Sequence, residues 1–204
     1  MRTLVANFYR ERVEEKIKRY VELAGRHSEP VEVPGDRLEP GYDLEGFSAV
    51  IISGSQWMLA RDDASPAIKE FIRGLEIPTL GICFGLQLLA RAYDAEVLSG
   101  EPIERNETIL VTEPHPLFFE LGPEVEMLES HREYVDYNGI ERVGWHVFAV
   151  SASCRVEAMH HPTRPLYGVQ FHPERSGANG EKLFENFYQQ IVQPLWRNRE
   201  SRRY

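Results

Sequence analysis

A cysteine stands at the junction between an apolar run and a helical pattern, in the stretch TLGICFGLQLLARAY over residues 79–93. The run up to Cys83 predicts a buried strand, and the residues after it predict a helix. The first amides and the dipole of a helix favour a thiolate, the nucleophilic form of cysteine. Gly81 and Gly85 permit a sharp strand-to-helix turn and close backbone approach. We predict that Cys83 is a nucleophile and that the Phe84 amide faces a developing oxyanion, the alternative being a buried structural cysteine.

A candidate base lies near the other end of the chain, in PLYGVQFHPERSG. An apolar strand pattern ends at His172, and Pro173 and Glu174 follow. Proline biases the preceding residue toward an extended backbone, so the Glu174 carboxylate can lie beside the imidazole. A cysteine nucleophile needs a base that takes and returns protons, and that base needs an orienting group. We predict these two roles for His172 and Glu174. A surface turn is the alternative for a lone His-Pro-Glu.

The elements that must position these residues alternate between strand and helix in the first half of the chain. Strand patterns cover residues 3–8, 31–35, 47–55 and 77–83, and helical patterns cover residues 11–26, 64–75 and 84–93. This order predicts an α/β fold, with an open and mostly parallel sheet flanked by helices on both faces. Ligands bind such sheets at the carboxyl ends of the strands, where Cys83 falls.

The second half of the chain predicts an antiparallel ribbon that returns to the main sheet. Short strand patterns are AEVLS, ETILVT, VEMLES, HVFAVS, CRVEAMHH and PLYGVQF. Asn138-Gly139 is a hairpin-turn signal between two of them. A final helix is expected from about Gly180 to Val192, followed by a flexible tail over about 196–204. No repeat or Pro/Gly/Ser-rich linker divides the chain, so we expect a single domain over residues 1–204.

Composition excludes several classes of partner. The chain has 204 residues and a net charge of −9, so nucleic acid is not expected to bind, and the basic tail RNRESRR is expected to be solvated. No stretch reaches the roughly 18 apolar residues of a membrane span. The start of the chain lacks the apolar segment of a signal peptide. We therefore expect a cytoplasmic protein without a membrane partner.

The remaining chemically active side chains give no second site. A disulfide between Cys83 and Cys154 is not expected in a reducing cytosol, and Cys154 falls within a strand pattern, so it is expected in the core. His160 and His161 lack the spacing to thiols or carboxylates that a metal site needs. No metal is predicted.

The two motifs together resemble the class I glutamine amidotransferases. G-x-C-x-G-x-Q covers residues 81–87, and G-x-Q-x-H-P-E covers residues 168–174. The resemblance implies a triad of Cys83, His172 and Glu174 that hydrolyses L-glutamine to glutamate and ammonia through a γ-glutamyl thioester. It implies no metal and no organic cofactor. The further site residues that it implies are the amides of Ser55 and Phe84 as the oxyanion hole, and Gly54, Gln87, Ser130 and His131 as glutamine-binding residues.

A finer resemblance concerns the partner. The segment CRVEAMHHPTRPLYGVQFHPE is most similar to the amidotransferase subunit or domain of guanosine monophosphate synthetase. About 30 residues follow Glu174, too few for a nucleotide-binding domain, so we expect a separate ATP-dependent synthetase subunit that receives the ammonia. Two alternatives remain open. One is a stand-alone hydrolase of γ-glutamyl compounds, and the other is a catalytically silent regulatory subunit of the same fold.

Three positions depart from the family pattern. Gly54-Ser55-Gln56 replaces the usual Gly-Gly-Pro, so Ser55 would be strained if this position requires a positive φ. Leu86 stands where histidine is common, and we expect this change to be tolerated because the side chain is not part of the triad. Glu133 stands where the subgroup usually has aspartate, which affects any contact to a partner that depends on that residue.

Overall fold

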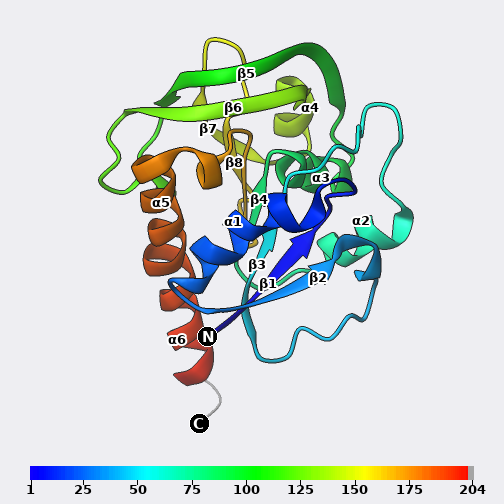
Figure 1. The fold of residues 1–204 in the computed structure, drawn as a ribbon, viewed down its shortest axis with the longest axis vertical. Helices are drawn as coiled ribbons and strands as arrows, with labels where there is room; N and C mark the ends of the chain where they lie inside the picture. Colours follow the sequence, from blue (N-terminus) through cyan, green and yellow to red (C-terminus); the bar gives the residue numbers. More distant parts are fainter. Residues whose placement is uncertain (202–204) are drawn as a thin grey trace.

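A single nine-stranded sheet runs through the computed structural model, which describes residues 1–201 (Figure 1). The strand order is β2-β1-β3-β4-β9-β8-β7-β5-β6. The strands are β1 (Arg2–Asn7), β2 (Glu29–Pro34), β3 (Phe47–Ile52), β4 (Thr79–Ile82), β5 (Val97–Val111), β6 (Glu124–Val135), β7 (His146–Val150), β8 (Ala158–His160) and β9 (Leu166–Val169). The helices are α1 (Val13–Gly25), α2 (Pro66–Arg73), α3 (Phe84–Ala92), α4 (Tyr137–Arg142), α5 (Gly177–Asn186) and α6 (Gln193–Ser201), with a π-helical stretch (Phe187–Val192) between the last two.

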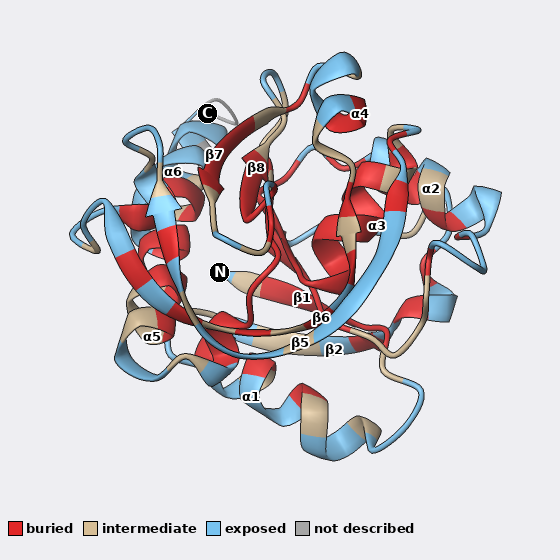
Figure 2. Cartoon of the chain, turned by 90° about the horizontal axis from the view of Figure 1, so that it is seen from above, coloured by how far each residue is buried: buried red, intermediate tan, exposed pale blue. Residues whose placement is uncertain are grey.

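The first half of the sheet is parallel and is covered on both faces. Strands β2, β1, β3, β4 and β9 pair in parallel. Leu4 and Ala6 of β1 belong to the apolar core shared with α2 and α3, whereas Val5 between them belongs to the core shared with α1 and α5. Neighbouring side chains of a strand point to opposite faces, so the central strands β1, β3 and β4 carry apolar side chains toward both faces. Figure 2 shows the central strands as almost continuously buried. The predicted α/β class is confirmed.

The second half of the sheet is antiparallel, as the short strand patterns predicted. Strands β5 and β6 form a long ribbon that lies across the top of the molecule in Figure 1. The prediction of two separate short strands here was wrong, because both belong to β5. The pairing register shifts between Ser99 and Ile103, close to Pro102, which cannot donate to the ladder. The middle of β5 consists mainly of exposed polar residues, so the sequence showed no strand pattern there.

Two other local predictions differ from the structure. Asn138 and Gly139 lie inside α4 rather than in a hairpin turn, because the Asp136 carboxylate caps this helix by accepting from the Gly139 amide at 2.7 Å. The last helical region begins at Gly177 instead of Gly180 and continues through α6. Residues 196–201 of the expected flexible tail are therefore helical, and residues 202–204 lie outside the described residues. None of the helices in the described range has the length and apolarity to span a membrane.

Candidate active site

Cys83 occupies the turn between β4 and α3 in a conformation that L-residues rarely adopt. Its φ is 52° and its ψ is −103°. In residues 1–201 only three other non-glycine residues have a positive φ, namely Arg12, Asp94 and Glu120. The strand ends at Ile82 and the helix begins at Phe84, so the whole change of direction falls on Cys83. This is the sharp, strained turn that the sequence predicts, and it costs on the order of 1–3 kcal/mol.

Two glycines make room for this turn. A Cβ on Gly81 would lie 2.5 Å from the carbonyl carbon and oxygen of Gly85, and a Cβ on Gly85 would lie 2.5 Å from the Ile52 carbonyl oxygen. Non-bonded heavy atoms do not approach this closely, so a methyl group at either position would push α3 away from the sheet. The close packing holds Cys83 at the carboxyl edge of β4.

His172 and Glu174 lie together beside Cys83. His172 Nδ1 donates to Glu174 Oε1 at 2.6 Å, while its Nε2 lies 3.2 Å from the Ser130 carbonyl oxygen. Cys83 Sγ lies 3.9 Å from the same carbonyl oxygen. The three residues are buried, with exposed fractions of 7% for Cys83, 6% for His172 and 4% for Glu174. The structure therefore brings the three predicted residues into one cluster.

The surroundings favour the charged form of His172. Burial alone would lower the pKa of this imidazole, but the charges of Glu174 and Cys83 and their hydrogen bonds outweigh it and raise the pKa of His172 well above its ordinary value. The hydrogen bonds agree, because a carbonyl oxygen only accepts and Nε2 must carry a proton to donate to Ser130. An imidazolium beside a cysteine stabilises the thiolate.

Two adjoining pockets meet at Cys83. The first, of about 340 Å³, contains in its lining the predicted residues Ser55, Cys83, Phe84, Gln87, Ser130 and His131. The second, of about 540 Å³, is lined by Ser55, Cys83 and Ser130 together with His172 and Glu174. Ligand pockets commonly have volumes in this range. Gly54 lines neither pocket, and its amide donates instead to the Tyr20 hydroxyl at 3.2 Å.

The loop after β3 is held without the strain that a positive φ at Ser55 would impose. Ser55 is not among the non-glycine residues with positive φ. Its hydroxyl donates to the Phe8 carbonyl at 2.8 Å and accepts from the Trp57 amide at 3.0 Å. Glu133 holds the far side of the loop, because its carboxylate accepts from the amides of Leu59 and Ala60 at 2.7 and 3.0 Å. The departures at positions 55 and 133 thus have structural roles in one loop.

Leu86, the remaining departure from the family pattern, is fully buried. It packs against Gly168, where an added Cβ would lie 3.0 Å from the Leu86 side chain.

Sequence reasoning missed two residues of the cluster. Gln170 Nε2 lies 3.6 Å from Cys83 Sγ, and its Oε1 accepts from Gln87 Nε2 at 3.2 Å. Tyr20 donates to Glu174 Oε1 at 2.9 Å. Gln170 is a fixed letter of the second motif, which was a usable signal. Tyr20 occupied one of the apolar positions of a helical pattern and was therefore read as a core residue. The one available signal was its hydroxyl, because a buried tyrosine hydroxyl usually has a hydrogen-bond partner.

A pair of buried carboxyl groups lies behind His131. Glu129 and Glu157 are fully buried, and burial raises the pKa of Glu129 to about 7 and that of Glu157 well above its usual range. His131 Nδ1 donates to the Glu133 carbonyl at 3.0 Å, and its Nε2 lies 3.3 Å from Glu129 Oε2. Burial lowers the pKa of His131, so the neutral ring can accept at Nε2 from a protonated Glu129.

The buried carboxyl group of Glu129 makes the free energy of unfolding depend on pH. The folded protein keeps a proton on Glu129 that the unfolded chain releases near pH 4.5, so stability falls as pH rises toward about 7. We expect Glu129→Gln, which mimics the protonated acid, to raise the free energy of unfolding at pH 8 by up to about 3 kcal/mol and to change it little at pH 4. Urea unfolding at both pH values measures this, with the exposed Glu124→Gln as control. Equal effects at the two pH values would contradict the assignment.

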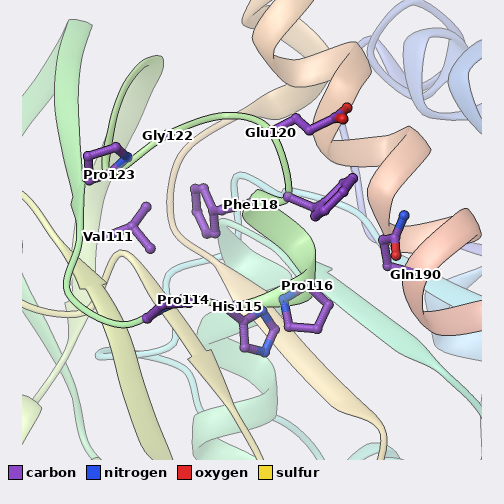
Figure 3. Close-up of a pocket in the computed structure, with 10 residues that line it drawn as sticks. Val111, Pro114, His115, Pro116, Phe118, Glu120, Gly122, Pro123 and Gln190 are labelled. Atoms are coloured by element: carbon purple, nitrogen blue, oxygen red, sulfur yellow. The ribbon is translucent and has the colours of Figure 1, made fainter.

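A larger cavity, of about 740 Å³, lies elsewhere (Figure 3). Residues between Val111 and Pro123 form most of its wall, and Gln190 contributes from the π-helical stretch. The wall is largely apolar and includes His115, whose pKa is lowered to about 3, chiefly by burial. It contains no cysteine and none of the predicted site residues.

The other candidate residues occupy ordinary positions. Cys154 is a free cysteine in the core, and burial raises the pKa of its thiol. His161 packs against the rings of Tyr93 and Trp145. Among residues 1–201, no three His, Cys, Asp or Glu side chains are grouped so that they could hold a metal ion.

The fold and the site define an α/β protein with a cysteine on a strand-to-helix turn beside a buried histidine–glutamate pair. The family described as glutamine amidotransferase class-I matches residues 4–191. The chain belongs to this family, as the two sequence motifs indicated.

Relatives agree with this assignment, and a solved structure shares the fold. The chain is 42% identical over 121 residues to a subunit of GMP synthase (glutamine-hydrolyzing) from Methanothermobacter thermautotrophicus, with 58% of this chain and 63% of the relative covered. It is 32% identical over 195 residues to GMP synthase (glutamine-hydrolyzing) of Thermosipho melanesiensis, with 94% of this chain and 36% of the relative covered. The matches thus span less than two thirds of these relatives. A Thermoplasma acidophilum structure, described provisionally as a GMP synthase subunit, shares the fold, with a TM-score of 0.83, 24% identity and 98% of both chains covered.

Proposed function

We propose that the chain hydrolyses L-glutamine to glutamate and ammonia with a triad of Cys83, His172 and Glu174. The observation that carries this proposal is the strained Cys83 turn beside a His172–Glu174 pair at 2.6 Å, at the junction of two pockets. The raised pKa of His172 supports it further, since an imidazolium favours the attacking thiolate.

The proposed reaction has two stages. The Cys83 thiolate attacks the side-chain amide carbon of glutamine, and the amides of Ser55 and Phe84 stabilise the tetrahedral oxyanion. His172, oriented by Glu174, gives a proton to the leaving nitrogen, so ammonia departs and a γ-glutamyl thioester remains. His172 then takes a proton from water, the hydroxide attacks the thioester, and glutamate leaves as the thiolate is restored.

Three further residues are proposed to hold the substrate. Gln87, Ser130 and His131 line the 340 Å³ pocket next to Cys83. Gln87 Nε2 already donates to the Glu133 carbonyl at 2.8 Å, so that nitrogen braces the pocket wall. Gly54 is proposed to act through the shape of its loop, because its amide is engaged by Tyr20.

The ammonia requires an acceptor. Relatives from several methanogens are described as one subunit of GMP synthase, which supports a separate partner in the form of an ATP-dependent synthetase. We propose that this partner aminates xanthosine monophosphate and that both proteins work in the cytoplasm. Co-purification from the native cell tests the pairing, and the absence of an ATP-hydrolysing partner would contradict it.

The activity itself is tested by glutamate release from L-glutamine, measured on the purified chain alone and with the candidate synthetase. We expect glutamate release under at least one of these two conditions. Faster turnover of other γ-glutamyl amides than of glutamine would favour a stand-alone γ-glutamyl hydrolase. No release under both conditions would favour a silent regulatory subunit.

A further inference from the structure

The hydroxyl of Tyr20 connects the two halves of the candidate site. Tyr20 belongs to α1, is fully buried, and lies 154 residues before Glu174 in the chain. Its hydroxyl is 2.9 Å from Glu174 Oε1, 3.2 Å from the Gly54 amide nitrogen and 3.1 Å from the Tyr9 hydroxyl. One oxygen atom thus contacts the proposed triad and the loop that carries the proposed Ser55 oxyanion amide.

The direction of each hydrogen bond follows from the groups involved. The Gly54 amide can only donate, so the Tyr20 oxygen accepts from it. Glu174, paired with His172, is a carboxylate and accepts, so the single Tyr20 proton goes to Oε1. Tyr9 then donates to the second lone pair of the Tyr20 oxygen. Every donor and acceptor site of the Tyr20 hydroxyl is used.

Removing this hydroxyl would leave two buried groups short of partners. Glu174 Oε1 would keep only the His172 bond, and Glu174 Oε2 already has no partner among the described residues. The Gly54 amide would lose its acceptor. A buried polar group without a partner tends to move until it finds one.

The fit around Gly54 agrees with a fixed arrangement. A Cβ at this position would lie 2.7 Å from the Tyr9 hydroxyl, 3.2 Å from the Tyr20 hydroxyl and 3.3 Å from His172 Cε1. The loop therefore lies directly against both tyrosines and the imidazole, and glycine is the residue that fits.

We propose that Tyr20 is a positioning residue that holds Glu174 against His172 and, through the Gly54 amide, sets the position of the oxyanion loop. This inference rests on the proposed function and adds to it a residue outside both sequence motifs. Tyr20 acts through Glu174 and Gly54 and does not touch the substrate.

The test compares Tyr20→Phe with the matched control Tyr9→Phe. Both variants remove one hydroxyl and keep the ring, but only Tyr20→Phe breaks the bonds to Glu174 and Gly54. Loss of a hydrogen bond to a charged group predicts a kcat for glutamine lower by about 10- to 100-fold in Tyr20→Phe, with KM changed little. Tyr9→Phe is expected to stay within about threefold of wild type.

A second readout is independent of turnover. Iodoacetamide alkylation at neutral pH reports the thiolate fraction of Cys83, once the contribution of Cys154 has been measured in Cys83→Ala and subtracted. In Tyr20→Phe the Glu174 carboxylate is no longer held against His172 Nδ1, so it stabilises the imidazolium less. The imidazolium in turn stabilises the Cys83 thiolate less, and alkylation of Cys83 should slow about tenfold. If wild type hydrolyses no glutamine, the proposed function fails, and the alkylation rates still test Tyr20.

The inference is overturned if Tyr20→Phe matches Tyr9→Phe in kcat and in alkylation rate. A double-variant comparison tests whether Tyr20 acts through Glu174. Tyr20→Phe should slow alkylation of Cys83 much less in the Glu174→Gln background than in wild type. Equal slowing in the two backgrounds would overturn the inference. One measurement needs no variant. The Gly54 amide should exchange slowly with solvent in wild type, and rapid exchange in the folded protein would also overturn the inference.

Discussion

The Cys83→Ala variant should lose glutamine hydrolysis by about 10⁴-fold or more while its thermal unfolding stays close to that of wild type. Alanine removes the sulfur that forms the thioester and leaves His172 and Glu174 without a nucleophile to activate. Alanine also adopts a positive φ no more easily than cysteine, so the strained turn changes little in energy. Glutamate release and a melting curve measure the two effects.

The matched control for this prediction is Cys154→Ala. Cys154 is the other buried free cysteine, its thiol contacts the Val156 carbonyl at 3.5 Å, and it lines neither pocket at Cys83. We expect Cys154→Ala to keep near-normal turnover. Substantial glutamate release by Cys83→Ala, for instance above about 1% of wild type, would remove the nucleophile from the proposed mechanism.

The Gly180→Ala variant should lose both stability and activity. A Cβ on Gly180 would lie 1.8 Å from the Pro173 carbonyl oxygen, 2.6 Å from its carbonyl carbon and 2.9 Å from its Cα. The obstacle is backbone, which cannot move aside as a side-chain tip can. Pro173 separates His172 from Glu174, so relief of the clash displaces the His172–Glu174 pair. We expect a loss of about 3 kcal/mol or more in the free energy of unfolding, and a fall in kcat larger than the loss of folded protein explains.

Gly25→Ala is the corresponding control. Gly25 is the last residue of α1, and a Cβ there would meet only Pro30 atoms at 3.7 and 3.9 Å, which is ordinary contact. Alanine at such a helical position is expected to be neutral or to stabilise by about 0.5–1 kcal/mol. Urea unfolding and kcat per folded molecule measure both variants. A Gly180→Ala protein as stable and active as Gly25→Ala would show that α5 is not packed against the Pro173 backbone.

The parts of the fold that the sequence predicted are those with local causes. The strand-to-helix turn at Cys83 is determined by a few consecutive residues, an apolar run followed by helical spacing. The strand that leads to His172 is likewise determined by a short apolar run. The α/β order followed from alternating apolar runs and helical spacing. Leu4 and Val5 belong to the apolar cores on opposite faces of the sheet, and this is why central strands such as β1 and β3 contain consecutive apolar residues.

The parts that sequence reasoning missed depend on distant contacts. The length of β5 is stabilised by pairing with β6, while its own polar residues argued for a break. Asn138-Gly139 fits a turn equally well until the Asp136 cap is known. The Tyr20–Glu174 bond joins residues 154 positions apart, and no periodicity reports such a pair. The pairing of Cys83 with His172 was predicted from the need of a cysteine nucleophile for a base and from the family resemblance, and their catalytic roles stay a prediction.

The positive φ of Cys83 has a consequence for evolution and for protein engineering. Glycine tolerates such a backbone freely, so Cys83→Gly should relax the turn and raise the melting temperature while destroying the proposed chemistry. Thermal stability therefore favours glycine at position 83, whereas turnover requires cysteine. A library of variants screened only for heat resistance would drift toward glycine there, and only a screen for glutamine turnover would retain the cysteine.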